Sequence, residues 1–164
     1  MSYTFPVLSL VERLKIVPQI GTVAWIGIRP SRGEAMTVLD DVEAVADRGL
    51  VGDRYKASGT RQVTLIQAEH LPVISALVGG EVTPQLVRRN LVVSGVNLLS
   101  LQKQRFAIGD VILVGTSACA PCDKMDIALG PGGFQAMRGH GGICAKIERG
   151  GVIRCGDRVR IISS

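Results

Sequence analysis

Two cysteines three residues apart, Cys119 and Cys122, are the residues of this sequence best suited to carry out chemistry. They follow a strand-like run at residues 110–115, and Pro121 between them fixes the local backbone at a φ of about −65°. A cysteine attacks electrophiles and binds metals as the thiolate, so cations such as Lys124 favour both reactions. The pattern indicates a reactive or metal-binding thiol site. A disulfide, or two small buried side chains, would give the same local sequence.

Glycines cluster on the C-terminal side of these cysteines, at residues 130–133 and 139–142. Consecutive glycines allow backbone amides to point together at a bound phosphate. The sequence contains neither the Walker pattern nor the dinucleotide fingerprint. The cluster therefore predicts an anion-binding loop that is not a standard nucleotide motif.

Two polar blocks earlier in the chain are further candidates for a site. Residues 49–55 end in Asp53, Arg54 and a tyrosine, and they suit either a hairpin turn with a surface ion pair or a loop that presents Arg54 to an anion. Residues 88–90, Arg-Arg-Asn, lie where a helix passes into a strand, as a solvated basic corner or as part of a site. We expect His70 to be a surface residue of a helix.

Short strands dominate the elements that must position these residues. Hydrophobic alternation and turn signals predict strands at 21–28, 36–38, 42–46, 61–67, 90–94, 106–115 (a hairpin), 143–148, 152–154 and 158–162. A glycine hairpin at 149–151 is expected to pair two of them. Residues 68–78 predict a helix with Leu71, Ile74, Leu77 and Val78 on one buried face, and Thr83-Pro84 starts another. The pattern favours a mainly β, barrel-like domain with small helical insertions.

The composition limits which classes of function are compatible with this chain. The chain has 164 residues, 20 glycines, four cysteines and a net charge of +5. This length predicts one domain at residues 21–164 after an N-terminal arm at residues 1–20. The basic residues are mostly dispersed, which favours an anionic small molecule over nucleic acid. With no signal peptide or membrane-length apolar run, we expect a cytoplasmic protein with reduced thiols and no membrane partner.

The order of these blocks resembles the MOSC family, named for the C-terminal domain of the molybdenum cofactor sulfurase. The resemblance runs in register from about Val23 to Ile162. It rests on Gly49-x-x-Gly52-Asp53-Arg54-Tyr55, Arg61-Gln62-Val63-Thr64-Leu65-Ile66, Arg88-Arg89-Asn90-Leu91-Val92-Val93-Ser94-Gly95, Phe106-x-Ile108-Gly109-Asp110, Cys119-x-Pro121-Cys122, Met137-x-Gly139-x-Gly141-Gly142 and Gly151-x-Ile153-x-x-Gly156-Asp157-x-Val159. Each block alone is a weak signal, but the ordered set is specific.

The resemblance implies a small stand-alone bacterial-type member with a closed β-barrel of complex topology. It implies that a cysteine thiolate ligates the molybdenum of a phosphorylated pterin cofactor, the molybdenum cofactor (molybdopterin). Some members keep only the second cysteine of the region, so Cys122 is the catalytic and metal-binding candidate, and Cys119 is a neighbour of undefined role. The matching cofactor-binding candidates are Asp53, Arg54, Arg61, Arg88, Arg89, Asn90, Gly141 and Gly142.

Three functions are compatible with these residues. The first is reduction of small N-oxygenated, N-hydroxylated substrates at a Cys-ligated molybdenum, with electrons from a separate reductase. The second is a sulfur carrier with a persulfide on Cys122. The third is a non-enzymatic binding module stabilised by a disulfide or by zinc on the four cysteines, with His140 as a substitute ligand. Residues 1–20 are too short to replace the N-terminal barrel extension of larger amidoxime reductases, so we expect a partner or a homo-oligomer to help enclose the cofactor.

Overall fold

The computed structural model describes residues 5–56 and 58–163. Strands dominate, and every helix is short. The helices are α1 (Leu10–Leu14), α2 (His70–Val78), α3 (Pro84–Val87), α4 (Lys124–Leu129) and α5 (Gly133–Met137), with a 3₁₀ turn η1 (Leu98–Leu101). The strands are β1 (Gly21–Ile28), β2 (Thr37–Leu39), β3 (Asp41–Val45), β4 (Gly49–Leu50), β5 (Val63–Gln67), β6 (Leu91–Ser94), β7 (Arg105–Ile108), β8 (Val111–Ala118), β9 (Ile143–Arg149), β10 (Gly151–Arg154) and β11 (Arg158–Ile161).

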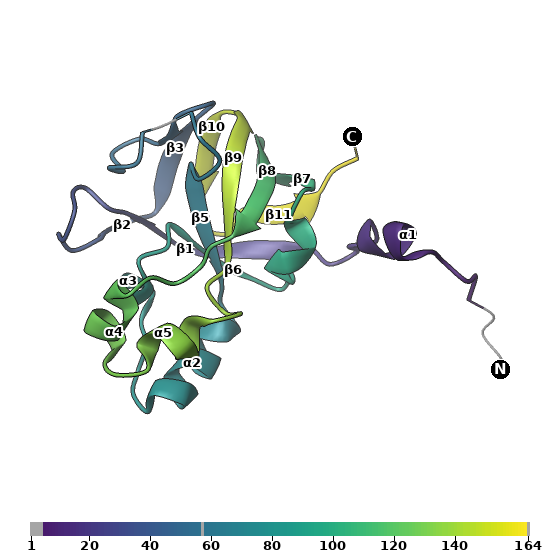
Figure 1. The fold of residues 1–164 in the computed structure, drawn as a ribbon. Coiled ribbons are helices and arrows are strands. Elements are labelled where there is room, and N and C mark those ends of the chain that lie inside the picture. Colours follow the sequence, from purple (N-terminus) through teal and green to yellow (C-terminus); the bar gives the residue numbers. More distant parts are fainter. Residues whose placement is uncertain (1–4, 57, 164) are drawn as a thin grey trace.

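Seven strands close into a barrel, in the order β11-β7-β8-β9-β5-β6-β1, and β1 pairs with β11 to complete the ring. The β5–β6 pair is parallel, and the other pairs of the ring are antiparallel. Strand β2 extends the sheet beyond β1, and β10-β3-β4 form a separate three-stranded sheet (Figure 1). This mixed barrel with short helices confirms the fold expected from the sequence.

Period-two alternation sorts the side chains of β5 between the inside and the outside of the barrel. Val63 and Leu65 are fully buried in the barrel core, together with Ile143 and Ala145 of the neighbouring β9. Thr64 and Ile66 point to the opposite face, as successive side chains in a strand must. The outer face of β5 is thus free to contribute polar and apolar groups to whatever covers it.

A layer of short helices covers that outer face. Ile66 of β5 packs in a second apolar cluster with Ile74 of α2, Met125 of α4 and Met137 of α5. Figure 1 shows α2, α3, α4 and α5 gathered on one side of the barrel. The predicted apolar face of α2 is only partly right, because Ile74 is buried whereas Leu77 is 61% exposed. Helix α4 was not expected, and it begins two residues after Cys122.

The sequence predicted most of the strands but not how all of them pair. Strand β10 does not form a hairpin with β9; it pairs with β3 through Gly151–Ala44 and its neighbours. Strand β2 pairs with β1, and β3 pairs with β4 and β10. Gly150 explains the first change: a Cβ there would lie 2.6 Å from the Ala44 carbonyl, so glycine permits the close approach of β3.

The described part of the arm, residues 5–20, contains α1. Ser9 and Glu12 form a reciprocal capping box at its start. No residue of α1 is buried, and Figure 1 shows the arm extending away from the barrel. Residues 1–4 of the predicted arm lie outside the described residues. Within the described ranges, no helix is long and apolar enough to cross a membrane.

Candidate functional site: a thiol pair in a polar frame outside the barrel

A buried ion pair joins Asp53, of the first polar block, to Arg29, which directly follows β1. The Asp53 carboxylate accepts hydrogen bonds from the Arg29 side chain at 3.2 and 3.0 Å and from its backbone N–H at 2.7 Å. It also accepts from the Tyr55 N–H. Desolvation alone would raise the pKa of Asp53, but the hydrogen bonds and charge of Arg29 outweigh it, and the pKa is lowered. Asp53 is therefore an anion that neutralises Arg29 rather than Arg54.

Asn90 ties this ion pair to the barrel. Its amide donates to Asp53 Oδ1 and to the Gly27 carbonyl, both at 3.1 Å. Its carbonyl oxygen accepts from the Thr64 N–H, the Thr64 hydroxyl and Arg29. Because both amide hydrogens and the oxygen are engaged and the residue is fully buried, Asn90 holds the frame and leaves no free donor.

Arg89 fastens the cysteine stretch to the glycine-rich stretch. Its buried guanidinium donates from Nε to the Gly141 carbonyl at 2.9 Å and from Nη2 to the Cys119 carbonyl at 3.3 Å. A third bond, from Nη1, reaches the Val87 carbonyl. Burial lowers the pKa of Arg89, and the Cys119 thiol opposes this. Arg89 therefore positions backbone segments 30 and 52 residues away.

Gly141 and Gly142 permit that close approach. A Cβ on Gly141 would lie 2.4 Å from the Cys119 carbonyl oxygen, and one on Gly142 would lie 1.8 Å from that of Leu65. Gly142 also has a φ of +83° and accepts the Cys119 N–H at 2.8 Å. These two glycines are explained by backbone packing around Cys119.

Cys119 and Cys144 form a buried thiol pair on the outer face of the barrel. A hydrogen bond from Cys144, joined by the charges of Arg89 and Arg61, outweighs desolvation and lowers the pKa of Cys119 from about 9 to about 6. The same hydrogen bond and burial raise the pKa of Cys144 above its ordinary value. Cys119 is therefore the more acidic thiol of the two.

Cations surround this frame. Arg88 is half-buried and donates to the Glu34 carbonyl; burial, then repulsion from Arg29 and Arg54, lowers its pKa. Arg29 and Arg61 also act on Cys119 through their charge. Because Asp53 neutralises only Arg29, the remaining arginines give this region an excess of positive charge.

Cys122, the predicted metal ligand, lies on an exposed turn three residues beyond the thiol pair. Its carbonyl accepts the Met125 N–H at the start of α4. Asp53 and Asn90 are hydrogen-bonded to each other, and the charges of Arg54 and Asp53 act on Arg88. Arg89 contacts the Cys119 backbone. The Cys122 thiol is exposed.

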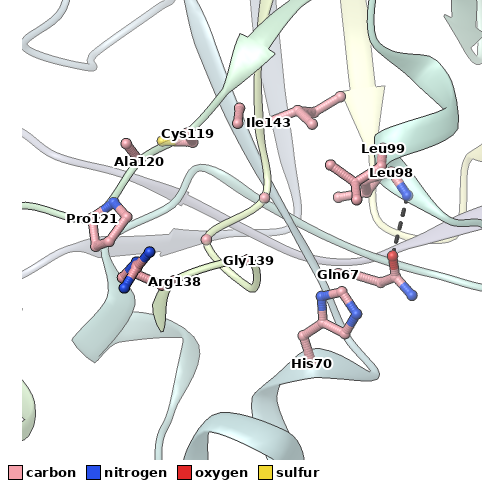
Figure 2. A pocket seen from close by; sticks show the side chains of 13 residues that line it. Gln67, His70, Leu98, Leu99, Cys119, Ala120, Pro121, Arg138, Gly139 and Ile143 are labelled. Carbon is pink, nitrogen blue, oxygen red and sulfur yellow. Dashed lines mark hydrogen bonds between the residues drawn. The ribbon is translucent and has the colours of Figure 1, made fainter. Parts of the chain in front are cut away.

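A cavity of about 270 Å³ is lined in part by the cysteine stretch (Figure 2). Its lining residues are Gln67, His70, Leu98, Leu99, Ala118, Cys119, Ala120, Pro121, Arg138, Gly139, Gly141, Gly142 and Ile143. Figure 2 shows Cys119, Ala120 and Pro121 along one wall, and Gln67 and His70 across from them. Most of this lining is apolar or backbone.

His70 was expected to be a surface residue, but it lines this cavity and meets the His140 ring edge-on at 5.2 Å between centroids. Desolvation, then His140, lowers its pKa, which favours a neutral imidazole. Sequence reasoning also missed Arg29, Thr64 and Cys144 as members of the polar frame. Thr64 carried a signal, since it is the outward residue of an alternating strand.

The four cysteines do not assemble into one structural site. All four are free thiols, and Cys155 lies on the β10–β11 turn against the Leu39 carbonyl. Across residues 5–56 and 58–163, no group of three or more His, Cys, Asp or Glu side chains is arranged to hold a metal ion. A zinc- or disulfide-stabilised module therefore finds no support in the described part of the chain.

A family model described as the MOSC domain matches residues 51–160, more than half of the chain. The chain belongs to the MOSC family. The matched span includes every predicted site residue and extends from the residue after β4 into β11. A comparison with curated proteins found no match.

Solved structures share the fold. The YuaD protein of Bacillus subtilis superposes with a TM-score of 0.78 at 18% identity, covering 91% of this chain and all of that one. YiiM from Geobacillus stearothermophilus gives a TM-score of 0.70 at 15% identity, covering 87% and 75% of the two chains. YiiM from Escherichia coli gives 0.66 at 16%, covering 90% and 70%. This MOSC protein therefore has the architecture of these small proteins.

Proposed function

We propose that this MOSC protein binds the molybdenum cofactor and reduces small N-oxygenated substrates, with the exposed Cys122 thiolate as the protein ligand of the metal. The observation that carries the proposal is the excess of arginine charge around the polar frame that holds the cysteine turn. The charge of Arg29 acts on both Arg88 and Cys119, three residues before Cys122, which supports a cofactor site at this end of the cysteine stretch.

The residues present fit the cofactor chemically. A thiolate is a soft ligand that suits a molybdenum centre already bound to sulfur, and Cys122 is accessible for it. Arg54, Arg61 and Arg88 are exposed or half-buried guanidinium groups that suit the cofactor's phosphate. Burial, then repulsion from Arg29 and Arg54, lowers the pKa of Arg88, and an anion there would offset that repulsion. Molybdenum bound at this place would supply two-electron redox chemistry.

The remaining predicted residues would act by positioning. Asp53 and Asn90 orient Arg29 and fix the start of β6, because their own polar atoms are already engaged. Arg89, Gly141 and Gly142 hold the backbone from which the cysteine turn departs. The overall reaction takes an N-hydroxylated compound, two electrons and two protons to the reduced nitrogen compound and water. A separate reductase would deliver the electrons, and we place the reaction in the cytoplasm.

Molybdenum content tests the proposal directly. We expect the full chain, produced in a host that makes the cofactor, to carry molybdenum and pterin in equal amounts. Cys122→Ala should lose the metal, whereas Cys155→Ala, a change at another exposed cysteine, should keep it. Arg88→Gln should weaken cofactor retention about 10- to 150-fold, the worth of one charge-assisted hydrogen bond of about 1.5–3 kcal/mol. Arg158→Gln, on the exposed side of β11, is the matched charge control.

The alternative functions give different outcomes. Protein without molybdenum but with a persulfide on Cys122 would support a sulfur carrier and overturn the proposal. Metal retention that survives Cys122→Ala but not Cys119→Ala would move the ligand to the buried thiol. A loaded protein that reduces no N-hydroxylated substrate with an artificial electron donor would remove the reductase activity and leave only cofactor binding.

A further inference from the structure

The N-terminal arm exposes a large share of the apolar side chains on the surface. Residues 7–20 are 14 of the 164 positions, yet they carry six of the thirteen exposed large hydrophobic side chains in residues 5–56 and 58–163. Figure 1 shows the arm leaving the barrel. A concentrated apolar stretch of this kind on a soluble protein marks an interaction surface. The six side chains are those of Val7, Leu10, Val11, Leu14, Ile16 and Ile20.

Helix α1 within the arm needs a surface to pack on. It has five residues and none of them is buried, although Ser9 and Glu12 cap its start. An isolated helix shorter than about 12–15 residues is marginal in water, and protein helices are stabilised mainly by packing of an apolar face. Leu10 and Leu14 are four residues apart and share one face of α1. The sequence thus encodes a helix whose apolar face is covered only when another molecule binds it.

A groove of about 550 Å³ lies at the root of the same arm. Ile16 and Val17, which follow α1, form one part of its lining, and Val96, in the loop after β6, forms another. Because each arm leads away from the root of its own groove, the arm of a second copy can enter that groove from the opposite direction. Its own groove then receives the first arm in return. Such a reciprocal contact is isologous, as in two-fold dimers, the commonest symmetric oligomers of soluble proteins.

The groove and the arm carry charges of opposite sign. Among the described residues that line the groove, Glu69 is the only charged one. The arm carries Arg13 and Lys15 against the single acid Glu12, which gives residues 5–20 a net charge of +1. Opposite charges across an interface steer association and fix its register. This complementarity favours the arm of a second copy as the occupant of the groove.

We propose that the protein forms a two-fold homodimer in which each arm crosses into the groove of the other copy. The sixteen described arm residues and the six other residues that line the groove make 22 residues a side, within the roughly 20–30 of a stable interface of standard size. The second copy covers the face of α1 that carries Leu10 and Leu14. Gln67 lines both the groove and the cavity of Figure 2, so the incoming arm lies beside one wall of that cavity.

Sedimentation velocity on the full-length, cofactor-free protein measures the association. We expect a dimer of twice the 17.4 kDa chain mass at micromolar concentration. Leu14→Glu should give a monomer, because burying a carboxylate against an apolar surface without a partner is costly. Leu77→Glu on α2 is the matched control, since the two side chains are 59% and 61% exposed, and it should stay dimeric. Both variants should keep the far-ultraviolet circular dichroism of the parent, because neither side chain belongs to the core.

A second variant tests the groove independently of the arm. The Glu69 carboxylate accepts the Gly95 N–H at 2.7 Å, and Glu69→Gln keeps an acceptor for that bond while it removes the charge. We expect Glu69→Gln to weaken the dimer about 1.5- to 5-fold, the worth of one exposed ion pair, and to make the association less sensitive to salt. Glu81→Gln, at an exposed acid that does not line the groove, should leave the dissociation constant unchanged.

Several results would overturn the proposal. One is a parent protein that is monomeric at every concentration, and binding of that monomer to vesicles of anionic phospholipid would assign the arm to a membrane surface instead. Another is a dimer that survives Leu14→Glu or dissociates equally with Leu77→Glu, because the contact would then lie elsewhere. A Glu69→Gln dimer with the affinity and salt dependence of the parent would remove the groove from the interface. None of these measurements requires molybdenum, so they are independent of the proposed cofactor chemistry.

Discussion

The Arg29–Asp53 ion pair gives a sharp stability prediction through the substitution Asp53→Asn. Both side chains are almost completely buried, at 5% and 1% exposure. Asparagine has the same size but removes the negative charge, and it turns an N–H₂ group toward the donors of Arg29, Tyr55 or Asn90. Removing one partner from a buried ion pair costs about 3–5 kcal/mol, because the other charge stays buried without compensation.

For a chain of this size, each kcal/mol lowers the melting temperature by about 2–4 °C, so we expect a loss of about 6–20 °C. Thermal unfolding followed by circular dichroism measures it. Asp47→Asn is the matched control, because Asp47 forms an exposed ion pair with Lys146 at 3.1 Å. Such a surface pair is worth about 0–1 kcal/mol. Equal losses in the two variants would refute the structural role of Asp53.

The pH dependence of stability provides a second test of Asp53→Asn. The folded-state pKa of Asp53 is below its ordinary value of 3.8, so its contribution is complete above the unfolded-state pKa. That contribution is lost as the pH falls through the folded-state value. We therefore expect wild-type protein to lose stability in acid below about pH 4 more steeply than Asp53→Asn does.

Two further substitutions test the glycine and histidine arguments. Gly142→Ala should lower the free energy of unfolding by more than the ~1–2 kcal/mol of a left-handed backbone alone, because its Cβ would meet the Leu65 carbonyl at 1.8 Å. Gly139→Ala, at a φ of +78° in open space, should cost only that left-handed backbone energy. Denaturant unfolding of the two variants measures the difference. Because the folded-state pKa of His70 is below the ordinary value of 6.5, the protein should lose stability as the pH drops below 6.5. His70→Gln should make the melting temperature depend less on pH in this range. An unchanged pH dependence would contradict the desolvation of the imidazole.

The barrel was predictable because its strands alternate in the plain period of two. Val63 and Leu65 face the core and Thr64 faces out, as the pattern of residues 61–67 indicated. The pairing of β10 with β3 could not be predicted from the sequence. It depends on a long-range contact at Gly150, while the local sequence reads as an ordinary glycine hairpin.

The site was predictable as a set of blocks, and its internal roles were not. The order of the blocks led to the MOSC family, and the family match over residues 51–160 includes all of them except the first two residues of the earliest block. Asp53 looked like the partner of its neighbour Arg54, but it binds Arg29, 24 residues away. Cys144 looked like a plain strand residue. Its position opposite Ser117 puts it two residues in register from Cys119 on the neighbouring strand, and this long-range pairing has no signal in the local sequence.

The pairing of β1 with β11 has a consequence for the order of synthesis. Gly21, at the start of the first barrel strand, pairs with Val159, in the last one. The ring therefore cannot close until nearly the whole chain has left the ribosome, and the edge of β1 stays open until then. An open strand edge is a template for association with other chains. The same adjacency suits a circular permutant in which residues 21 and 161 are joined by a short linker and new ends are cut at an exposed turn such as Gly79-Gly80.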